Sequence, residues 1–523
     1  MSSAIPPETF LTALTPALLV VGGIVSPLVF KRGKGVAAST GLFFLVALAV
    51  NTWMLLGMQH GSFYYYPTIE GLVLNPASAF VVELTLILGL LGVIYSYRYF
   101  EEEKILSPFY LLFSFFIATL VLMATSFNML IIYIAFEAST IAGGILILFT
   151  RRRSATKAAV RFFLLSVIGA VIILVGILYQ NQLTGGFMLI DPVTKLSAFS
   201  GIANSDLVLL STLYAIGFSI KVGIFPFGLL WLPAAHSEAP TPVSAILSGV
   251  MVQIAAFAVS RVVGVINPAS TQLGAALAIL GALSVITGAV LAAVEATSGS
   301  KYSRFHVGSI HIRGIKRIWA FSTSSEVGVF YLLIGLALME PAYSPLFFAG
   351  ILLHFLNHGL AKALLFFDSG FVIETSRTAD LSVLKGLGGK VGVNGLSYLI
   401  GGFSLALIPG TLGYNTFLEF TSGHMGIEVT ALILTAAAFI FFTTLYSLRA
   451  IISGKPKAKV EYLKPPHGHA VLRIPGVVLG VFLVALGLVV LFGASGIALG
   501  EYYQVFKEWF ELAAETITKV GAF

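Results

Sequence analysis

The chain has 523 residues, of which 58% are hydrophobic and 10% are charged, and its formal net charge is +7 at pH 7. This composition excludes a soluble globular domain and is typical of an integral membrane protein, so the lipid bilayer is its expected environment. The sequence contains no cysteine, which excludes disulfides, iron–sulfur clusters and thiolate metal sites within the chain. Any redox chemistry would therefore belong to a partner.

Apolar stretches long enough to cross a bilayer, about 20 residues each, recur along the whole chain. The pattern predicts about 14 transmembrane helices and an all-α integral membrane protein, with residues 1–523 forming a single transmembrane domain. The stretches lie near residues 11–30, 36–57, 77–97, 107–126, 128–150, 158–180, 207–230, 242–264, 271–294, 316–338, 344–367, 393–412, 429–451 and 474–497.

The basic residues predict an orientation for these helices. Lys and Arg concentrate in the loops after the first, third, fifth, ninth, eleventh and thirteenth expected helices, which places those loops in the cytoplasm. The opposite side carries Lys195, Arg261, Lys507 and Lys519. An even number of helices then puts both termini on the outer side of a multi-pass protein of the cell membrane. This placement accounts for the positive charge, so no nucleic-acid partner is expected.

The segment 501–520 places apolar residues at helical spacing, with Lys507 and three glutamates opposite. This pattern predicts an amphipathic helix that lies on the outer membrane surface or docks on a neighbour.

Several ionisable residues fall deep within the expected helices, where burying each charge is costly. A lone residue of this kind could be a structural hydrogen-bonding group. Residues of both signs on successive helices favour a proton or cation relay instead. They are Glu83, Glu137, Lys221, Glu326, His354, His358 and Lys362, with Arg161 about one turn inside its helix.

Lys221 lies five residues before Pro226, where a helix loses a backbone hydrogen bond and kinks. Glu137 is its natural partner of opposite charge. In one interpretation Lys221 accepts and releases a proton as its partner moves. In the other, the two residues form a static buried ion pair that fixes helix packing.

His358 and Lys362 are four residues apart and share one helix face, so they can pass a proton along the helix. Alternatively, His358 bonds a neighbouring carbonyl and Lys362 extends to the cytoplasmic end. His236, in a polar turn, either bridges two half-channels or stabilises the turn. His467 and His469 are too few to indicate a metal site, and none is expected.

Several motifs resemble the antiporter-like subunits of respiratory complex I, a module shared with membrane-bound hydrogenases and multisubunit cation/proton antiporters. The resemblance runs from about residue 70 to 450. It rests on FEAS around Glu137, AAVRFFLLS around Arg161, GFSIKVGIFPF around Lys221, WLPAAHSEAPTPVSA around His236, KRIWAFSTSSEVG from Lys316 and NHGLAKALLFF around Lys362.

The resemblance implies two inverted five-helix repeats, helices 4–8 and 9–13, with helices 7 and 12 broken near Pro226 and Pro409. The parts of the domain are residues 1–106 (the first three helices), 107–264 (the first repeat), 271–451 (the second repeat) and 452–523 (the last transmembrane helix and the amphipathic helix). The implied ion-translocation residues are Glu137, Lys221, His236, His358 and Lys362, with Arg161, Gln253, Glu326 and Glu419 as accessory candidates.

The chain departs from the family pattern at two positions. Gln253 stands where a lysine is usual, and a neutral amide cannot take up a proton at physiological pH. Phe417 stands where helix 12 usually has a lysine or glutamate. Glu419 lies about 200° further round a helix and is a poor substitute. We therefore expect an intact first half-channel and a damaged second one. A third departure, the inserted loop 295–314, either contacts a peripheral arm or is tolerated loop length.

These features predict an ion-translocating (H⁺ or Na⁺) antiporter-like subunit of a redox-driven complex, such as a membrane-bound hydrogenase or a sulfur-reducing complex. The subunit would perform no bond-breaking chemistry and carry no cofactor. Its partners would be other membrane subunits and a peripheral arm with Fe–S or metal redox centres. Two alternatives are a subunit of a secondary Na⁺/H⁺ antiporter without a redox arm and a structural connecting subunit with an impaired second half-channel.

Overall fold

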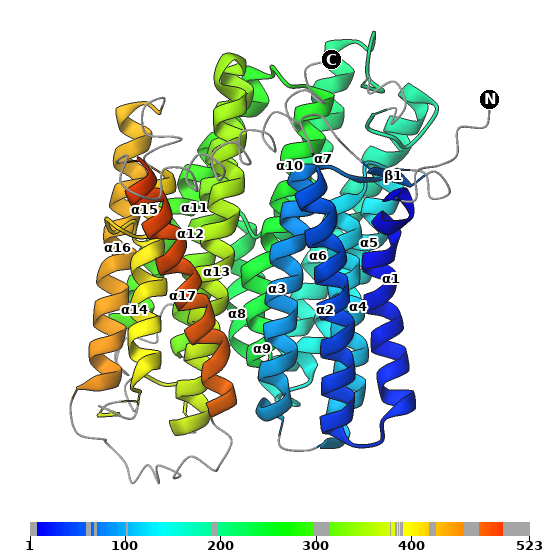
Figure 1. The fold of residues 1–523 in the computed structure, drawn as a ribbon. Helices are drawn as coiled ribbons and strands as arrows, with labels where there is room; N and C mark the ends of the chain where they lie inside the picture. Colours follow the sequence, from blue (N-terminus) through cyan, green and yellow to red (C-terminus); the bar gives the residue numbers. More distant parts are fainter. Residues whose placement is uncertain are drawn as a thin grey trace.

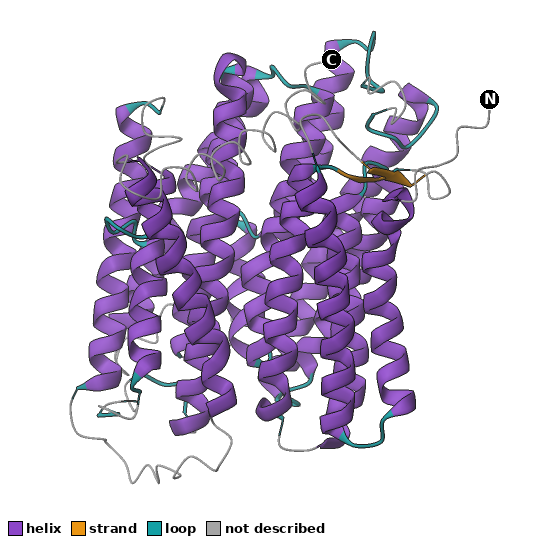
Figure 2. Ribbon diagram, viewed as in Figure 1, coloured by secondary structure: helices purple, strands orange, loops and turns teal. Residues whose placement is uncertain are grey.

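The structure is a computed structural model. It describes residues 8–58, 64–66, 71–100, 103–190, 197–297, 314–376, 378–381, 384, 386–387, 391–417, 425–453 and 470–494. Helices lie side by side across the molecule, and the described connections lie mostly at its two ends (Figures 1 and 2). Thirteen helical segments of the described residues are long and apolar enough to cross a membrane. The predicted all-α membrane fold is confirmed.

The N-terminal part consists of α1 (Glu8–Val29), α2 (Gly33–Gly57) and α3 (Pro76–Tyr99). Asn75 caps α3 by accepting a hydrogen bond from the backbone N–H of Ser78 at 2.8 Å, which satisfies a donor at the helix start. A short antiparallel hairpin of β1 (Tyr64–Tyr66) and β2 (Leu72–Leu74) lies at one end of these helices (Figure 1). Hydropathy did not predict this hairpin.

The first half of the bundle contains a helix that is broken where the sequence predicted. Gly223 ends α7 with a φ of +83°, a conformation that glycine adopts without strain, and Pro226 directly precedes α8. The elements of this half are α4 (Glu103–Thr125), α5 (Met129–Leu148), α6 (Arg153–Thr184), α7 (Asn204–Val222), α8 (Phe227–Glu238), α9 (Thr241–Ile246), the π-helical turn η1 (Leu247–Met251) and α10 (Val252–Ile266).

The second half repeats this feature. Its broken helix consists of α14 and α15, and the predicted break at Pro409 falls between them, next to Gly410 with a φ of +85°. Together with the thirteen apolar spans, one of which contains the α7–α8 break, this pair matches the expected transmembrane stretches one for one. The elements are α11 (Thr271–Thr297), α12 (Ile315–Met339), the 3₁₀ turn η2 (Pro341–Tyr343), α13 (Ser344–Ser376), α14 (Val393–Leu405), α15 (Leu412–Phe417), α16 (Ile427–Ile452) and α17 (Ala470–Ala494).

The centre of the bundle is formed by α10, α12 and α13, whereas most residues in the apolar stretches of α2, α6 and α16 are not fully buried. Small residues allow the closest packing: a Cβ at Gly281 of α11 would lie 2.7 Å from the carbonyl oxygen of Gly328 on α12. The tilted α17 contacts α13, α14 and α3, and so joins the second half to the N-terminal helices (Figure 1). Polar side chains on α10, α12 and α13 are therefore shielded from lipid.

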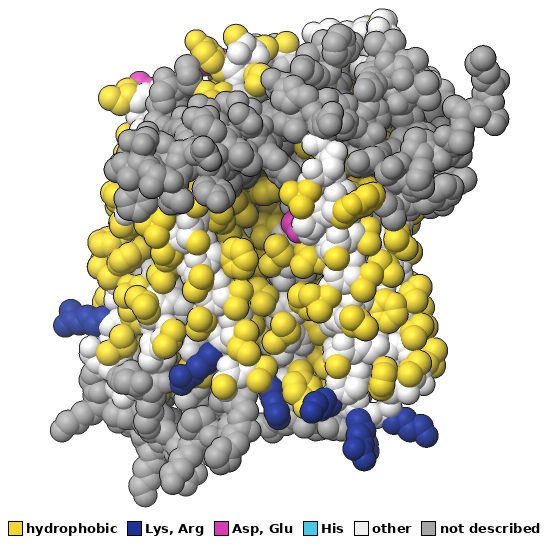
Figure 3. Space-filling view, in the orientation of Figure 1, with side chains coloured by type: hydrophobic (Ala, Val, Ile, Leu, Met, Phe, Trp, Pro, Cys, Tyr) yellow, Lys and Arg dark blue, Asp and Glu magenta, His cyan; other side chains and the backbone are white. Residues whose placement is uncertain are grey.

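The surface is an apolar band with basic side chains of the described residues gathered below it in Figure 3. A charge distribution of this kind is expected for a membrane protein with a cytoplasmic face at that end. The expected amphipathic helix at 501–520, Glu419, His467, His469 and most of the loop 295–314 lie outside the described residues.

Two basic residues near the ends of expected helices are buried in the bundle. Arg261 lies within α10, 2% exposed, and donates hydrogen bonds of 2.8 Å to the carbonyl oxygens of Met123 and Ala124 at the end of α4. Lys316 lies in the first turn of α12, 5% exposed, and donates a bond of 2.5 Å to the carbonyl oxygen of Ala239. Both lysine and arginine can bury their charge when backbone carbonyls at helix ends accept from them.

Candidate functional site: a buried polar axis

Lys221 is completely buried at the end of α7, beside the break, and its ammonium group is bound by α5. Nζ donates to the carbonyl oxygen of Phe136 at 2.7 Å, to Oγ of Ser139 at 2.6 Å and to Oγ1 of Thr140 at 2.7 Å. It also lies 4.1 Å from the centre of the Phe136 ring, a cation–π contact. The three acceptors match the three N–H donors of an ammonium group.

The hydroxyl groups around Lys221 are oriented as acceptors. Those of Ser139 and Thr140 donate their own protons to the carbonyl oxygen of Phe136, at 2.7 and 3.0 Å. Their lone pairs are therefore left for Lys221. This arrangement fits the protonated lysine.

Glu137 is on α5 but does not join this group directly. Phe136, Ser139 and Thr140 are spaced so that they share one helix face, and Glu137 points about 100° away from Phe136. Among the described residues no ion pair within 4 Å connects Glu137 to Lys221, so the structure does not form the static ion pair that was one of the two interpretations of the sequence. Glu137 is half-buried, and its Oε1 has no hydrogen-bond partner within the described part of the chain.

Buried polar groups continue from α8 and η1 toward α13. His236, fully buried on α8, places Nδ1 2.9 Å from the carbonyl oxygen of Leu232, and its ring lies 6.1 Å from that of Phe366 on α13. Ser248 on η1 and Thr323 on α12 share a hydroxyl–hydroxyl bond of 2.7 Å. His236 and the Ser248–Thr323 pair thus extend the buried polar groups from α8 to α12 and α13.

Gln253 is fully buried on α10, where the family pattern has a lysine. Its Nε2 donates to the carbonyl oxygen of Gly249, a residue of the π-helical turn η1, and its Oε1 has no partner among the described residues. Nε2 also approaches Gly359 on α13, where a Cβ would lie 3.4 Å away. The amide therefore bonds its own helix backbone and bears no charge.

Lys362 and His358 are one helical turn apart on α13 and are both completely buried. Lys362 donates to Oγ of Ser322 and, at 3.3 Å, to the carbonyl oxygen of Trp319, both on α12. The lysine thus does not extend to the cytoplasmic end. Neither ring nitrogen of His358 has a hydrogen-bond partner of good geometry among the described residues, although the backbone of Ser248 lies beside the ring.

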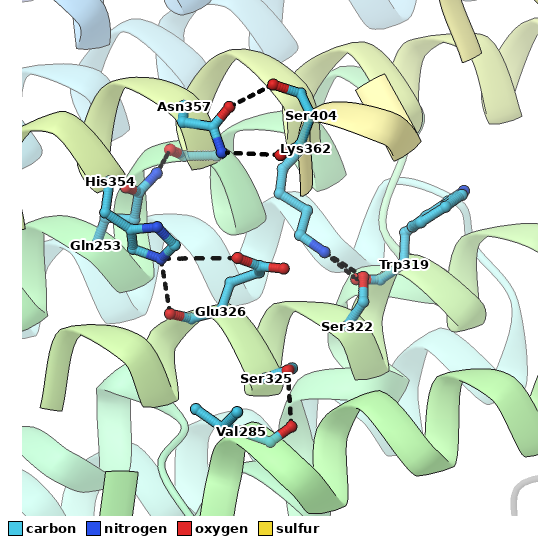
Figure 4. A network of polar contacts seen from close by, with 11 residues as sticks. Gln253, Val285, Trp319, Ser322, Ser325, Glu326, His354, Asn357, Lys362 and Ser404 are labelled. Atoms are coloured by element: carbon cyan, nitrogen blue, oxygen red, sulfur yellow. Dashed lines mark hydrogen bonds and ion pairs between the residues drawn. The ribbon is translucent and has the colours of Figure 1, made fainter. Parts of the chain in front are cut away.

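Glu326 forms the acidic part of this second site. Its Oε2 lies 3.7 Å from Nε2 of His354, which also bonds the Glu326 carbonyl oxygen at 2.9 Å. Figure 4 shows the Glu326 carboxylate between the His354 ring and the Lys362 ammonium group. The structure thus brings together an acid, two histidines and a lysine from α12 and α13.

A cavity lies beside this group and extends toward the second broken helix. Its lining includes Glu326, His354, Asn357 and Gly413. Asn357 accepts a 2.6 Å hydrogen bond from Ser404 near the end of α14 (Figure 4). Polar groups therefore connect Glu326 with the break between α14 and α15. The side chain of Phe417, the last residue of α15, is outside the described part.

Three other ionisable residues in the helices, the candidates Arg161 and Glu83 and also Asp368, make their own contacts. Arg161 is half-buried on α6, and none of the hydrogen bonds found in the described part connects it with the axis. Glu83 accepts from Asn51 and Thr52 of α2, at 2.7 and 2.6 Å. Asp368 accepts from Asn394 and Ser397 of α14, both at 2.6 Å. The last two carboxylates join neighbouring helices.

Sequence reasoning missed the hydroxyl groups that bind the two lysines. They are Ser139 and Thr140 beside Lys221 and Ser322 beside Lys362. It missed the Ser248–Thr323 pair as well, whose hydroxyl groups bond each other. It also recorded His354 only as an ionisable residue and did not connect it with Glu326. Their spacing offered a signal, because His354, His358 and Lys362 follow one another at intervals of four on one helix.

The chain matches a family model over more than half of its length. The family model for the transmembrane domain of NADH:quinone oxidoreductase and Mrp antiporters matches residues 126–298 and 306–445, which is more than half of the chain. The chain belongs to this family. The match includes both buried lysines and the break between α7 and α8.

Named members of the family are similar over most of this chain. NADH-quinone oxidoreductase subunit N of Desulforudis audaxviator is 26% identical over 482 residues, 88% of this chain and 90% of the relative. A Na(+)/H(+) antiporter subunit of Bacillus subtilis is 26% identical over 469 residues, 88% of each chain. Hydrogenase-4 component B of Escherichia coli is 28% identical over 351 residues; the match spans 65% of this chain but only 49% of that relative.

The fold is also found in a solved respiratory complex. A chain of the membrane-bound sulfane sulfur reductase (MBS), an archaeal respiratory membrane complex, matches with a TM-score of 0.78 and covers 98% of each chain at 17% identity. At this identity the likeness shows a common fold. That chain therefore shares the overall fold in which Lys221 and Lys362 lie here.

Proposed function

We propose that this chain is an ion-translocating, antiporter-like membrane subunit of a redox-driven complex related to complex I. The observation that supports it is the buried polar axis, which begins at Lys221 beside one broken helix and reaches Glu326 beside the cavity that leads to the other. Charged groups at membrane depth are costly and are typical of ion pathways. The membership of the family and the names of its relatives point the same way.

Lys221 is the proposed proton carrier of the first half-channel, residues 107–264. Its ammonium group is bound by neutral acceptors only, so a change of charge at the nearby Glu137 alters how strongly Lys221 is held without breaking an ion pair. The half-buried position of Glu137 leaves it within reach of a neighbouring membrane subunit. A conformational change in that neighbour would then reach Lys221 through α5.

The proton would continue to the second half-channel, residues 271–451. His236, the Ser248–Thr323 pair and His358 are the groups between Lys221 and Lys362. From Lys362 the proposed route leads to Glu326 and the adjoining cavity. In this chain Glu326 and His354 supply the ionisable groups that the family pattern places on helix 12. The second half-channel is therefore rerouted and functional.

The proposed subunit carries no redox cofactor of its own. Electron transfer would take place in a peripheral arm with Fe–S or metal centres, held by partner subunits. We place both termini outside the cytoplasm, since the basic end of the molecule contains the loop between α1 and α2.

Two other functions have an observation in their favour. Similarity to the Na(+)/H(+) antiporter subunit of Bacillus subtilis over 88% of both chains favours a secondary antiporter without a redox arm. The neutral Gln253, bonded to its own helix, favours a connecting subunit that no longer transports ions.

One experiment separates the three functions. The tagged chain is purified in mild detergent from its native membrane, and the co-purifying proteins are identified by mass spectrometry. Subunits with redox centres support the proposal, whereas a complex of small membrane subunits alone supports the antiporter. Reconstituted complex with Lys221→Ala should then lose ion transport while Lys34→Ala, a change of an exposed lysine on α2, keeps it. If an assembled Lys221→Ala complex keeps full transport, the connecting role is the function that the result supports.

A further inference from the structure

Glu326, His354 and His358 are close enough to share one ion. One potential ligand atom from each, a carboxylate oxygen and two imidazole nitrogens, lies within 4.8 Å of the other two. In a tetrahedral zinc site, metal–ligand distances of about 2.0–2.2 Å place neighbouring ligand atoms about 3.4 Å apart. We propose that these three residues bind a divalent transition-metal ion of the zinc class.

The helices hold the three residues in a geometry that metal sites use. His354 and His358 are one turn apart on the same face of α13, the spacing at which two histidines of one helix bind zinc in metalloproteases. Their ring centres are 5.8 Å apart and the ring planes form an angle of 76°, so the rings do not stack. Glu326 approaches from α12, with Oε2 3.7 Å from Nε2 of His354.

The unpaired ring of His358 is a second, independent observation that points to a bound ion. His358 is 0% exposed, and neither of its ring nitrogens makes a hydrogen bond of good geometry to the described residues. A buried polar group without a partner is destabilising. Coordination to a metal ion would satisfy one of these nitrogens, and the other could face the backbone of Ser248.

The site also has room for a fourth ligand. The cavity between α12, α13 and α16 is lined by Ser325, Glu326, His354 and Asn357. A water molecule there would complete a tetrahedral zinc site, because zinc sites with three protein ligands keep one position for water or substrate.

The donor atoms decide which ions fit. Imidazole nitrogens suit zinc, cobalt, nickel and copper, whereas sodium, magnesium and calcium take oxygen ligands. Two neutral imidazoles and one carboxylate leave a net positive charge on the occupied site, one helical turn from Lys362. Metal binding therefore competes with the ammonium form of Lys362.

Occupation of the site has a functional consequence. The ion would engage His358 and Glu326, on both sides of the step through Lys362, and so would stop proton passage in the second half-channel. This inhibitory effect rests on the proposed function, whereas binding of the ion does not. Zinc binding and zinc inhibition can therefore fail separately.

The test uses the intact complex purified through a tag without histidines and stripped with a chelator. It is titrated with zinc chloride, and bound zinc is compared between wild type and Glu326→Gln. We expect wild type to bind one additional ion per chain. The difference between the zinc K-edge absorption spectra of wild type and Glu326→Gln reports the additional ion. It should show two nitrogen ligands at about 2.0–2.1 Å and one carboxylate oxygen at about 2.0–2.2 Å from the zinc.

Matched variants locate the ion. Glu326→Gln and His358→Gln should each weaken zinc binding at least about tenfold, since even residues outside the ligand set change metal affinity 10–100-fold. The double variant His467→Ala/His469→Ala, which removes the two loop histidines, should bind as wild type does. Equal zinc binding by wild type and Glu326→Gln, or loss of binding only in the double variant, overturns the proposal.

A measurement on the wild-type complex alone covers the case in which the variants do not assemble. Copper with ascorbate oxidises histidines that bind it, and peptide mass spectrometry identifies them. We expect oxidation of His354 or His358 that zinc suppresses. If neither His354 nor His358 is oxidised, the proposed metal site is wrong. Saturating zinc that binds without slowing transport would overturn the inhibitory role only.

Discussion

Lys221 on α7 donates a hydrogen bond to Ser139 on α5, with Nζ 2.6 Å from Oγ. The pair joins the helix that ends at the first break to the helix that carries Glu137. A buried ammonium group requires such acceptors, because a charge without partners at membrane depth is costly. The strength with which α5 holds Lys221 therefore controls how readily the lysine moves.

Ser139→Ala is expected to lower proton transport about tenfold or more. The substitution removes one acceptor from a charged donor, and such hydrogen bonds contribute about 1.5–3 kcal/mol. Proton uptake into vesicles that contain the reconstituted complex measures the effect. Thr435→Ala on α16 is the control, because this exposed hydroxyl bonds only the carbonyl oxygen of Ala431 in its own helix. Equal rates in both variants would show that Ser139 does not control Lys221.

Glu326→Gln is expected to reduce transport at least about tenfold while the complex assembles. The change keeps the shape of the side chain but removes the only carboxylate that faces His354 and Lys362 in the described part of α12 and α13. Without that charge the second half-channel has no acid to accept from Lys362. Proton transport per assembled complex, in the absence of zinc, is the readout. Unchanged transport would mean that protons leave by a route that avoids Glu326.

The sequence allowed the spans and both breaks to be predicted because hydropathy and proline act locally. Pro226 and Pro409 lie at the breaks whatever the helices pack against. The partners of Lys221 could not be predicted in this way. They depend on how α5 is rotated about its axis, and that rotation turns Ser139 rather than Glu137 toward α7.

For the same reason the sequence did not predict the pairing of Glu326 with His354 or the burial of Lys316. Glu326 and His354 lie on different helices, and only the packing of α12 against α13 brings them together. Lys316 follows a polar loop and its charge suggested a cytoplasmic position. In the structure α12 begins at Ile315, so Lys316 points into the bundle and bonds the end of α8. Local patterns contain neither relationship.

Arg261→Met is expected to destabilise the protein without abolishing transport by the complexes that assemble. Its guanidinium donates to the carbonyl oxygens of Met123 and Ala124 at the end of α4. Leaving such buried acceptors without a donor costs about 1–3 kcal/mol each. The apparent Tm of the detergent-purified complex should fall. The apparent Tm of the Arg261→Lys complex should fall less, because lysine keeps one donor group. A larger loss of specific transport than of Tm would instead place Arg261 on the ion route.

Gly228→Ala is expected to disrupt the first broken helix. A Cβ at Gly228 on α8 would collide with the carbonyl oxygen of Gly223, a backbone atom that cannot rotate away. The two ends of the break would have to separate, and Lys221, two residues before Gly223, would move with them. We expect a lower Tm and loss of transport by the complexes that remain. Gly186→Ala is the matched control, because its Cβ would meet nothing within 4 Å. A Gly228→Ala complex with the Tm and the transport rate of the control would show that the tight break is not required to position Lys221.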